Sequence, residues 1–473
     1  MPGICGLITL YVGMVLSMPV LADAQGPRVA AYTLDVAFAP AAATMRGEAV
    51  VRFNPSDSVG DSVRCYLHGE LSVDSVLVDG VPTVPSERPV FYDFDYSLIA
   101  REITIPVAGA MPQSLTIAYS GLFNRSQSRS PSDYMRIDEG GVFLRAYGYS
   151  LWFPVFLPAR ADDYDVDFDR VTVRLPRGFT GVFVGARTGA RTVGDTVITE
   201  WTAPNTSLFA AQLTARPFQI LRGGAFEILH LPDSASADAA RSILAFAQLL
   251  CHRYAARYRA PDTAAVHYVV QMPPYGDIAS GGVTGLMEST WRVFSEDENA
   301  QRALAHELVH SYVRLDVPRD DSLYCLAVEG FPSYFHLPCV AEQRGAEFYN
   351  RFVGWMEKLY LDRRATGKDR RGRPVPPEKP LLTLTADDLP AYKDGFVLGD
   401  RALLFLNFLR ARMGRRFDDF TADLFCAGVT SIGQFRAMIE KHLPGSAADV
   451  RIWLETTEYP ERLRFDHYRM VEP

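Results

Sequence analysis

The pattern of apolar and polar positions divides this chain into two halves of different character. In the first half, from Arg28 to about Arg222, short runs of alternating or β-branched residues are separated by turn residues. The clearest runs are YTLDVAF, AVVRF, SVLVDG, SLTIAYSG, RVTVRLP and TVITEW. Runs of this length and period predict a β-sandwich or a saddle-shaped β domain, with a hairpin turn at Val78-Asp79-Gly80.

After Gly223, apolar residues recur at helical spacing over long stretches. These stretches are SADAARSILAFAQLLCHRYAARY, DENAQRALAHELVHSYVRL, AEFYNRFVGWMEKLYLDRR, FVLGDRALLFLNFLRARMG and SIGQFRAMIEKHL. One strand-like run, AAVHYVVQM, comes early in this half and precedes the glycine-rich GDIASGGVTGLMEST. We therefore expect a multidomain α+β protein, with a β-rich domain over residues 25–222, a mainly helical domain over residues 223–460 and a C-terminal tail over residues 461–473.

A basic segment over residues 363–380, RRATGKDRRGRPVPPEKP, interrupts the helical pattern. Its glycines and prolines from Gly367 to Pro377 exclude a helix, so we expect a solvated loop. The alternative is a docking patch for an acidic partner or a lipid.

The N-terminus carries an uncharged apolar run over residues 4–22 that ends in Ala22-Asp23-Ala24, a small-x-small pattern of the kind a signal peptidase cuts. We therefore expect residues 1–24 to be a signal peptide and the protein to be exported, either periplasmic or secreted. The segment before the run lacks Lys and Arg, and the run is long enough to cross a bilayer. An uncleaved N-terminal membrane anchor is therefore the alternative.

Composition narrows the function classes. With 473 residues, 48% of them hydrophobic and 22% charged, the chain can bury a large globular core. The net charge of -8 and pI near 5.7 argue against a nucleic-acid partner. Without Cys5 in the leader, an odd number of cysteines remains and none lies in a CxxC pair, so buried thiols are expected rather than a cysteine zinc site. Cys325 and Cys339 are the only pair close together in the sequence, so a disulfide between them is one alternative. No sequence feature specifies the oligomeric state.

Candidate chemistry lies in LAHELVHSYVRLDVPRDDSLYCLAVEGF, which covers residues 304–331. The S-x-x-E pattern from Ser295 to Glu298 predicts a capping box and a helix start. On that helix His306 and His310 are four residues apart, so both imidazoles leave the same face and suit one tetrahedral zinc. A second helix from about residue 322 would carry Glu329 back toward them as a third ligand.

Three protein ligands leave a fourth position open for water, which is typical of a catalytic rather than a structural zinc. Glu307 is adjacent to the site and is placed to accept a proton from that water, whose pKa zinc lowers to about 7. The reaction class implied is metal-assisted hydrolysis of an amide. The alternative, a helix whose His and Glu only face solvent, requires three ligands at working spacing by chance.

The full pattern is H-E-x-x-H-x18-E, with Gly330 and Phe331 directly after Glu329, and it resembles the aminopeptidase N family, peptidase family M1, among the gluzincins. Two further motifs are similar to those of the family. Gly285-Leu286-Met287-Glu288-Ser289 resembles G-x-M-E-N, and Tyr392-Lys393-Asp394-Gly395 resembles Y-x-K-G. The resemblance runs from the β-rich domain to about residue 460 and implies a thermolysin-like catalytic domain.

The resemblance implies one Zn2+ per chain on His306, His310 and Glu329, with Glu307 as the general base. It also implies that Tyr392 donates a hydrogen bond to the oxyanion, and losing such a donor typically costs roughly 10²- to 10³-fold in rate.

On the same resemblance, Glu288 would bind the free α-amine of a peptide substrate, and the backbone of Gly285 and Leu286 would pair with the peptide. A zinc aminopeptidase acting on peptides is therefore the leading hypothesis.

The sequence departs from the family pattern at Ser289, Val328 and Asp394, and Pro332 is expected to bend the helix that carries Glu329. The family's second amine-binding position, usually Glu or Gln, falls on Leu144 or Arg145. Neither side chain accepts a hydrogen bond from an ammonium, which weakens the expected selectivity for N-termini.

The chain also ends soon after residue 460, so we expect a more open cleft than in the larger members. Two alternatives to an aminopeptidase therefore stand. One is a zinc peptidase with relaxed end selectivity, and the other is a binding scaffold without turnover.

Overall fold

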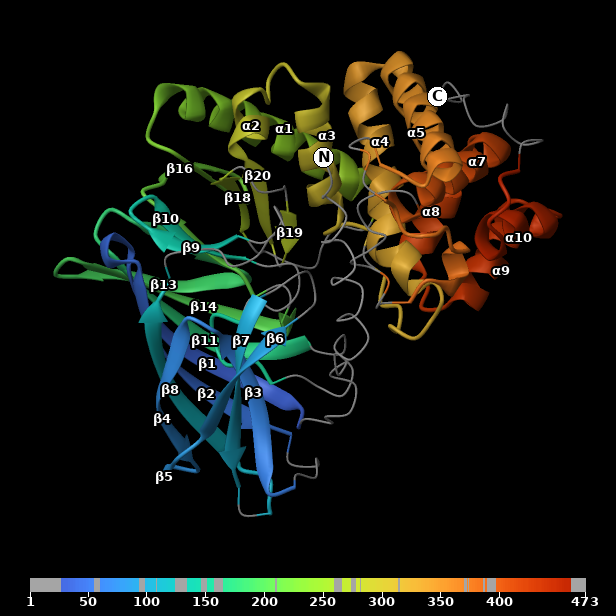
Figure 1. Ribbon diagram of the computed structural model, residues 1–473. Helices are drawn as coiled ribbons and strands as arrows, with labels where there is room; N and C mark the ends of the chain where they lie inside the picture. The colour runs from blue at the N-terminus through green and yellow to red at the C-terminus, as the bar shows by residue number, and fades with distance from the viewer. Residues whose placement is uncertain are drawn as a thin grey trace, which may run out of the picture.

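A β-rich N-terminal half and a mainly helical second half form the chain, as predicted (Figure 1). The computed structural model describes residues 27–54, 60–92, 98–107, 109–123, 134–145, 151–156, 165–208, 211–258, 266–273, 278–280, 282–313, 315–369, 372, 374–385, 388 and 397–460. The expected leader over residues 1–24 and the tail over residues 461–473 lie outside these ranges. Among the described residues, no helix is long and apolar enough to cross a membrane.

An eight-stranded sheet dominates the first half, and its strands β1 and β11 are parallel while the other neighbours are antiparallel. Along β1 the buried residues Leu34, Val36 and Phe38 alternate with more exposed ones, so one face of the sheet faces a core. Asp79 and Gly80 both have positive φ, of 49° and 79°, and form the predicted hairpin turn between β4 and β5. In sheet order the strands are β13 (Ala186–Val193), β14 (Thr196–Ser207), β11 (Asp165–Pro176), β1 (Val29–Ala39), β2 (Thr44–Phe53), β8 (Ser114–Leu122), β4 (Leu71–Val78) and β5 (Val81–Thr83).

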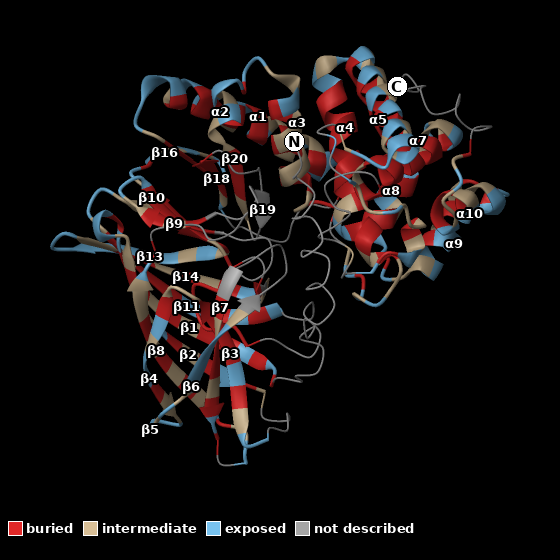
Figure 2. Cartoon of the chain, viewed as in Figure 1, coloured by how far each residue is buried: buried red, intermediate tan, exposed pale blue. Residues whose placement is uncertain are grey.

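Two smaller antiparallel sheets complete this half and share its core. The core contains the fully buried Trp152 and Trp201, whose indole N–H groups donate to Ala211 O and Thr199 Oγ1. Buried residues are red in Figure 2 and collect between the strand layers. The first small sheet has β3 (Ser62–His68), β7 (Leu98–Pro106) and β6 (Ser86–Tyr92), and the second has β12 (Thr180–Phe183), β15 (Leu213–Arg216), β10 (Gly141–Arg145) and β9 (Tyr134–Asp138). A single-turn 3-10 helix, η1 (Pro40–Ala42), links β1 and β2.

The second half begins with a five-stranded mixed sheet, whereas the sequence pattern predicted only one strand-like run there. Its central strands β17, β18 and β20 are parallel. The missed strands are short, and β17 is buried at every position, so it shows no alternation for a pattern to detect. In sheet order the strands are β16 (Gln219–Gly223), β17 (Phe226–His230), β18 (His267–Met272), β20 (Val283–Met287) and β19 (Ile278–Ser280).

Helices α1 to α3 lie over this sheet, and α5, α7, α8 and α9 pack against α4 (Figure 1). Helix α4 is buried at every position from Phe331 to Ala341, so it is the centre of the helical half. The α-helices are α1 (Ser234–Arg257), α2 (Glu288–Arg292), α3 (Glu298–Val309), α4 (Phe331–Arg344), α5 (Ala346–Thr366), α7 (Ala402–Met413), α8 (Arg416–Cys426), α9 (Ile432–His442) and α10 (Ala447–Glu455). Two π-helical turns, η3 (Leu326–Gly330) and η6 (Val397–Arg401), and a 3-10 turn, η4 (Leu381–Thr383), connect them.

Two local predictions need correction. The basic segment was predicted to be a loop from residue 363, but α5 continues to Thr366 and ends at Gly367, which has φ of +63°. Its described residues from there to residue 380 are non-helical, as expected. The Cys325–Cys339 disulfide that the sequence left open is not formed: both residues are buried as thiols, and Cys325 Sγ lies 3.0 Å from Thr385 O.

Candidate metal centre

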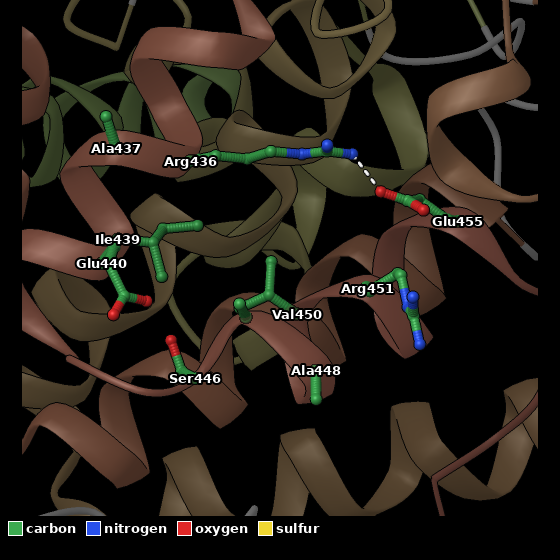
Figure 3. A pocket seen from close by; sticks show the side chains of 10 residues that line it. Arg436, Ala437, Ile439, Glu440, Ser446, Ala448, Val450, Arg451 and Glu455 are labelled. Carbon is green, nitrogen blue, oxygen red and sulfur yellow. Dashed lines mark hydrogen bonds and ion pairs between the residues drawn. The ribbon is translucent and has the colours of Figure 1, made fainter.

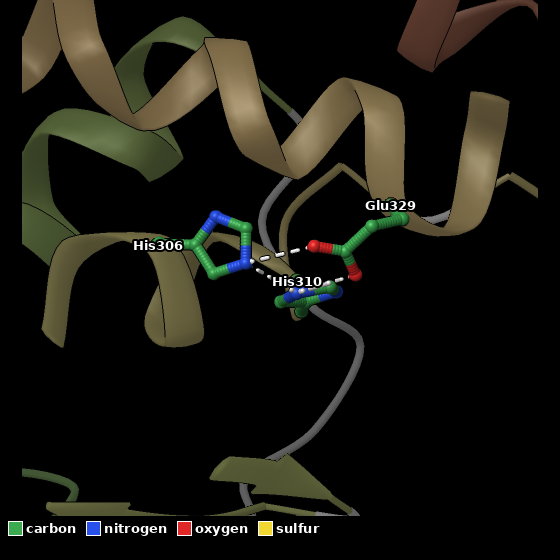
Figure 4. Close-up of side chains that lie close together, drawn as sticks. All are labelled: His306, His310 and Glu329. Carbon is green, nitrogen blue, oxygen red and sulfur yellow. Dashed lines mark hydrogen bonds and ion pairs between the residues drawn. The ribbon is translucent and has the colours of Figure 1, made fainter. Parts of the chain in front are cut away.

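His306, His310 and Glu329 converge on one point, as the sequence predicted (Figure 4). His306 lies on α3, His310 caps its C-terminal end, and Glu329 lies on the π-helical turn η3. The two imidazole Nε2 atoms are 3.4 Å apart, and His306 Nε2 is 3.2 Å from Glu329 Oε1. His310 Nε2 is 3.9 Å from the second carboxylate oxygen.

This spacing fits a tetrahedral zinc ion. Ligand atoms about 2.0–2.1 Å from a tetrahedral zinc are separated from one another by about 3.3 Å, which follows from the geometry of the tetrahedron. Two of the three measured separations, 3.4 and 3.2 Å, agree with that value. The donor set, two imidazoles and one carboxylate, is also one that zinc prefers in catalytic sites. The three residues therefore can hold Zn2+ with little rearrangement.

The helix that carries both histidines is shorter than predicted. The S-x-x-E capping box is wrong, because Asp297 caps α3 and its carboxylate accepts from Asn299 N at 2.7 Å. The backbone N–H groups of Glu296 and Asp297 both donate to Val293 O, so a separate turn precedes the helix. The helix ends at Val309 and not within the following SYVRL. His310 keeps helical backbone angles, φ of -51° and ψ of -32°, and therefore still projects beside His306.

Glu329 lies on the helix that was predicted from about residue 322; this helix begins at Tyr324 and passes through a π-helical turn, η3, at Glu329 before it continues as α4. Phe331 N donates to Leu326 O, five residues back, and α4 follows directly with Pro332 in its first turn. Pro332 has no N–H to donate to Val328 O, which would be its α-helical partner. The π-helical turn η3 lies just before it, at the place where a bend was expected. A Cβ on Gly330 would lie 2.5 Å from Leu326 Cδ1 and 3.0 Å from Ala402 Cβ. Gly330 therefore permits the close packing of η3 on α7 that fixes Glu329.

Helix α1 holds the two ligand-bearing segments in register. Its buried Tyr254 hydroxyl donates to Ala305 O at 2.8 Å, directly before His306. One turn later the buried Tyr258 hydroxyl donates to Phe335 O at 2.7 Å on α4. Both phenols use their one polar atom on a backbone carbonyl beside the site, so α1 sets the spacing between α3 and α4.

The two neighbouring carboxylates favour the charged form of the His306 imidazole. Burial alone lowers the pKa of His306, but the hydrogen bond with Glu329 and the charges of Glu329 and Glu307 outweigh it and raise that pKa above its usual value. Behind His306, with ring centroids 5.5 Å apart, lies the buried His336, which the sequence pattern did not single out. Its Nδ1 is 2.8 Å from Pro332 O, and burial lowers its pKa well below the usual value, so this ring is neutral.

The other predicted residues are placed as follows. Glu307 is half-buried on α3, and its charge acts on His306. Tyr392 falls outside the described residues. Gly285 and Leu286 lie on β20, where both pair with β18, and the pairing of β20 with β19 extends as far as Gly285. Their pairing with a peptide stays a prediction.

Glu288 begins α2 directly after β20, and an arginine that was not predicted from the sequence reaches its carboxylate. Arg216 Nη1 lies 2.8 Å from Glu288 Oε1, with both side chains largely buried. Arg216 ends β15, the strand that pairs with β10. The sequence placed the second amine-binding position at Leu144 or Arg145 on β10, whereas the partner of Glu288 comes from the neighbouring strand.

A separate hollow lies between α9 and α10 and has a volume of about 610 Å3 (Figure 3). Its wall includes Ile439, Ser446 and Val450, and the Arg436–Glu455 ion pair crosses its rim. None of the metal-site residues lines it, so we assign it no part in the chemistry.

Comparison with known proteins supports the same architecture. No family model and no curated protein matches the sequence. Among solved structures, an M1 zinc metallopeptidase from Deinococcus radiodurans is similar at a TM-score of 0.61 and 16% identity, covering 95% of this chain and 97% of that one. Leukotriene A4 hydrolase from Saccharomyces cerevisiae is similar at a TM-score of 0.63 and 16% identity, covering 92% of this chain and 68% of that one. The chain therefore has the two-domain fold of the M1 zinc metallopeptidases, with a β-rich domain followed by a mainly helical one.

Proposed function

We propose that this protein is a zinc-dependent metallopeptidase that binds one Zn2+ per chain and hydrolyses peptide bonds. The observation that carries the proposal is the convergence of His306 Nε2, His310 Nε2 and a Glu329 oxygen within 4.8 Å of one another. Two imidazoles and one carboxylate leave a fourth position for water, as catalytic zinc requires. A purely structural zinc would take four protein ligands, and the described residues offer these three.

In the proposed mechanism, Glu307 accepts a proton from the attacking water and later returns it to the leaving amine. When bound, zinc supplies Lewis acidity that lowers the pKa of a coordinated water to about 7. Glu307 follows His306 on the same helix, and its negative charge already acts on that imidazole. The hydroxyl of Tyr392 is proposed to donate a hydrogen bond to the oxyanion as the carbonyl carbon becomes tetrahedral.

Peptides are the proposed substrates. The Deinococcus radiodurans metallopeptidase has been crystallised with a Tyr-Ser-Ala substrate, and a two-domain M1 zinc metallopeptidase with L-tryptophan. The first candidate activity is that of an aminopeptidase, which releases N-terminal residues. In that case Glu288 would bind the α-amine of the substrate, and the backbone of Gly285 and Leu286 would pair with the peptide. The ion pair between Arg216 and Glu288 favours the second candidate, a peptidase with relaxed end selectivity.

Export remains part of the proposal. A cleaved signal peptide over residues 1–24 would place the enzyme in the periplasm or outside the cell, and an uncleaved one would anchor it to a membrane. The test is N-terminal sequencing of the protein purified from its own host. A sequence starting at Gln25 supports cleavage, and one starting at residue 1 or 2 supports the anchor.

Removal of the metal tests the proposed activity. We expect a panel of aminoacyl and N-acylated fluorogenic peptides to be hydrolysed by the purified protein, and a chelator such as 1,10-phenanthroline to abolish the hydrolysis. Adding one equivalent of Zn2+ per chain should restore it, because the three ligands are already within 4.8 Å of one another. The readouts are zinc content by elemental analysis and the initial rate. Hydrolysis that survives complete zinc removal, or no hydrolysis of any peptide by the zinc-loaded protein, would overturn the proposal.

A further inference from the structure

The site that would receive the N-terminus of a peptide already contains a cation. Arg216 Nη1 and Glu288 Oε1 are 2.8 Å apart, and their side chains are only 14% and 24% exposed. At this degree of burial a guanidinium and a carboxylate are held together by a charge-assisted hydrogen bond, and the pair as a whole is neutral. Glu288 therefore presents a neutral ion pair, and not an isolated negative charge, to any incoming group.

Arg216 is fixed in this position by the hairpin between β9 and β10. Its Nε donates to Gly140 O at 3.3 Å, and its guanidinium carbon lies 5.5 Å from the centre of the Phe143 ring. Its aliphatic part runs beside Gly141, where a Cβ would lie 2.9 Å from Arg216 Cγ. Three separate contacts orient this side chain, so it does not rely on Glu288 alone for its conformation.

Resting on the proposed peptidase function, we propose that Arg216 is the residue that sets end selectivity, by neutralising Glu288. A protonated α-amine gains little from a carboxylate that is already paired, and it meets a positive guanidinium beside it. A substrate whose corresponding group is an uncharged amide loses nothing. The enzyme therefore accepts peptides that extend beyond, or are acylated at, the position where a free amine would sit.

The experiment compares kcat/KM for one aminoacyl fluorogenic peptide and for its N-acetylated form. For the wild-type protein we expect the two values to agree within about threefold, since a neutral pair offers no large electrostatic difference between them. Arg216→Met keeps the length and apolar surface of the side chain and removes its charge. We expect this variant to favour the free amine by about 10-fold or more, because Glu288 becomes an unpaired carboxylate able to bind an ammonium.

Two further variants identify the cause. Arg216→Lys retains the positive charge and should keep the preference near the wild-type value. In Arg216→Met/Glu288→Gln the gained preference should disappear, because the carboxylate responsible for it is gone.

Arg187→Met is the matched control. Arg187 pairs with Glu227 at 2.8 Å and also lies over aromatic rings, Trp201 and Tyr268, yet it does not contact Glu288. Arg187→Met should lower the free energy of unfolding and leave the ratio of kcat/KM for the free and N-acetylated peptides at the wild-type value.

The outcomes separate this inference from the proposed function. If neither peptide is hydrolysed by the zinc-loaded protein, the peptidase function itself fails. If chelator-sensitive hydrolysis occurs but the wild-type protein prefers the free amine by about 100-fold, the neutralising role of Arg216 is overturned while the function stands. Equal preferences in Arg216→Met and Arg187→Met would overturn that role as well.

Discussion

Glu307→Gln is expected to lower kcat by about 10²- to 10⁴-fold, the usual contribution of a positioned general base. Gln has nearly the shape of Glu but cannot accept and return the proton of the attacking water. None of the three proposed metal ligands changes, so we expect the variant to bind as much Zn2+ per chain as the wild-type protein. The measurements are kcat for a fluorogenic peptide and zinc content by elemental analysis on the same preparation.

Glu296→Gln is the matched control for this variant. This substitution removes the same negative charge just before α3. The Glu296 side chain is exposed, and its backbone N–H donates to Val293 O in the turn that precedes the helix. We expect its kcat to stay at the wild-type value. If Glu307→Gln keeps both its zinc and its wild-type kcat, another group is the base and the proposed mechanism is wrong. If the wild-type protein and both variants bind zinc and none hydrolyses a peptide, the result supports the alternative of a binding scaffold without turnover.

The convergence of the three candidate metal ligands could be predicted from the sequence because their placement depends mostly on local geometry. Four residues on a helix bring His306 and His310 to one face, whatever the rest of the fold does. The short connection after them limits where Glu329 can lie. The exact form of the turn that carries Glu329 was not predictable, because it depends on Gly330 packing against Ala402, a residue far along the chain. Two competing capping residues, Ser295 and Asp297, likewise look equally suitable in the sequence alone.

Arg216 could not be predicted because its role depends on contacts between distant segments. Arg216 ends β15 in the four-stranded sheet, 72 residues from Glu288, which begins α2, and it reaches Glu288 only because β15 pairs with β10 in one particular register. The sequence did show that the expected amine-binding position on β10 holds no suitable acceptor. That gap was the one available signal that the charge around Glu288 differs from the family pattern, but it pointed to Leu144 and Arg145 instead of the adjacent strand.

A buried arginine in the second half has the largest expected effect on stability. Arg401 ends η6, which follows the segment 389–396 that includes Tyr392, and its side chain is 0% exposed. Its Nη1 is 2.9 Å from Glu378 Oε1, and its guanidinium lies over the Trp453 ring at 5.7 Å. Its remaining hydrogen bonds go to Tyr360 Oη and to the carbonyl oxygens of Ile452, Trp453, Thr456 and Glu458. One side chain thus joins η6 to α5, to α10 and to the residues that follow α10.

Arg401→Met is expected to lower the free energy of unfolding by about 3–5 kcal/mol, because it removes the nearer cation from Glu378, whose side chain is only 10% exposed and whose other cationic partner, Arg364 Nε, is 3.5 Å away. The carbonyl oxygens at the end of α10 also lose their donor, which adds a desolvation cost that methionine cannot offset. The measurement is the thermal unfolding midpoint, which for a domain of 150–250 residues should fall by roughly 2–4 °C per kcal/mol.

Arg416→Met provides the control, since Arg416 is exposed at the first turn of α8 and should change stability by less than about 0.5 kcal/mol. Equal midpoints for the two variants would mean that the network around Arg401 does not stabilise the helical half.

A large loss of stability in Arg401→Met should also reduce kcat at temperatures below the unfolding midpoint. The reason is that η6 begins at Val397, five residues after Tyr392 along the chain, so loosening η6 is expected to disturb the placement of the proposed oxyanion donor.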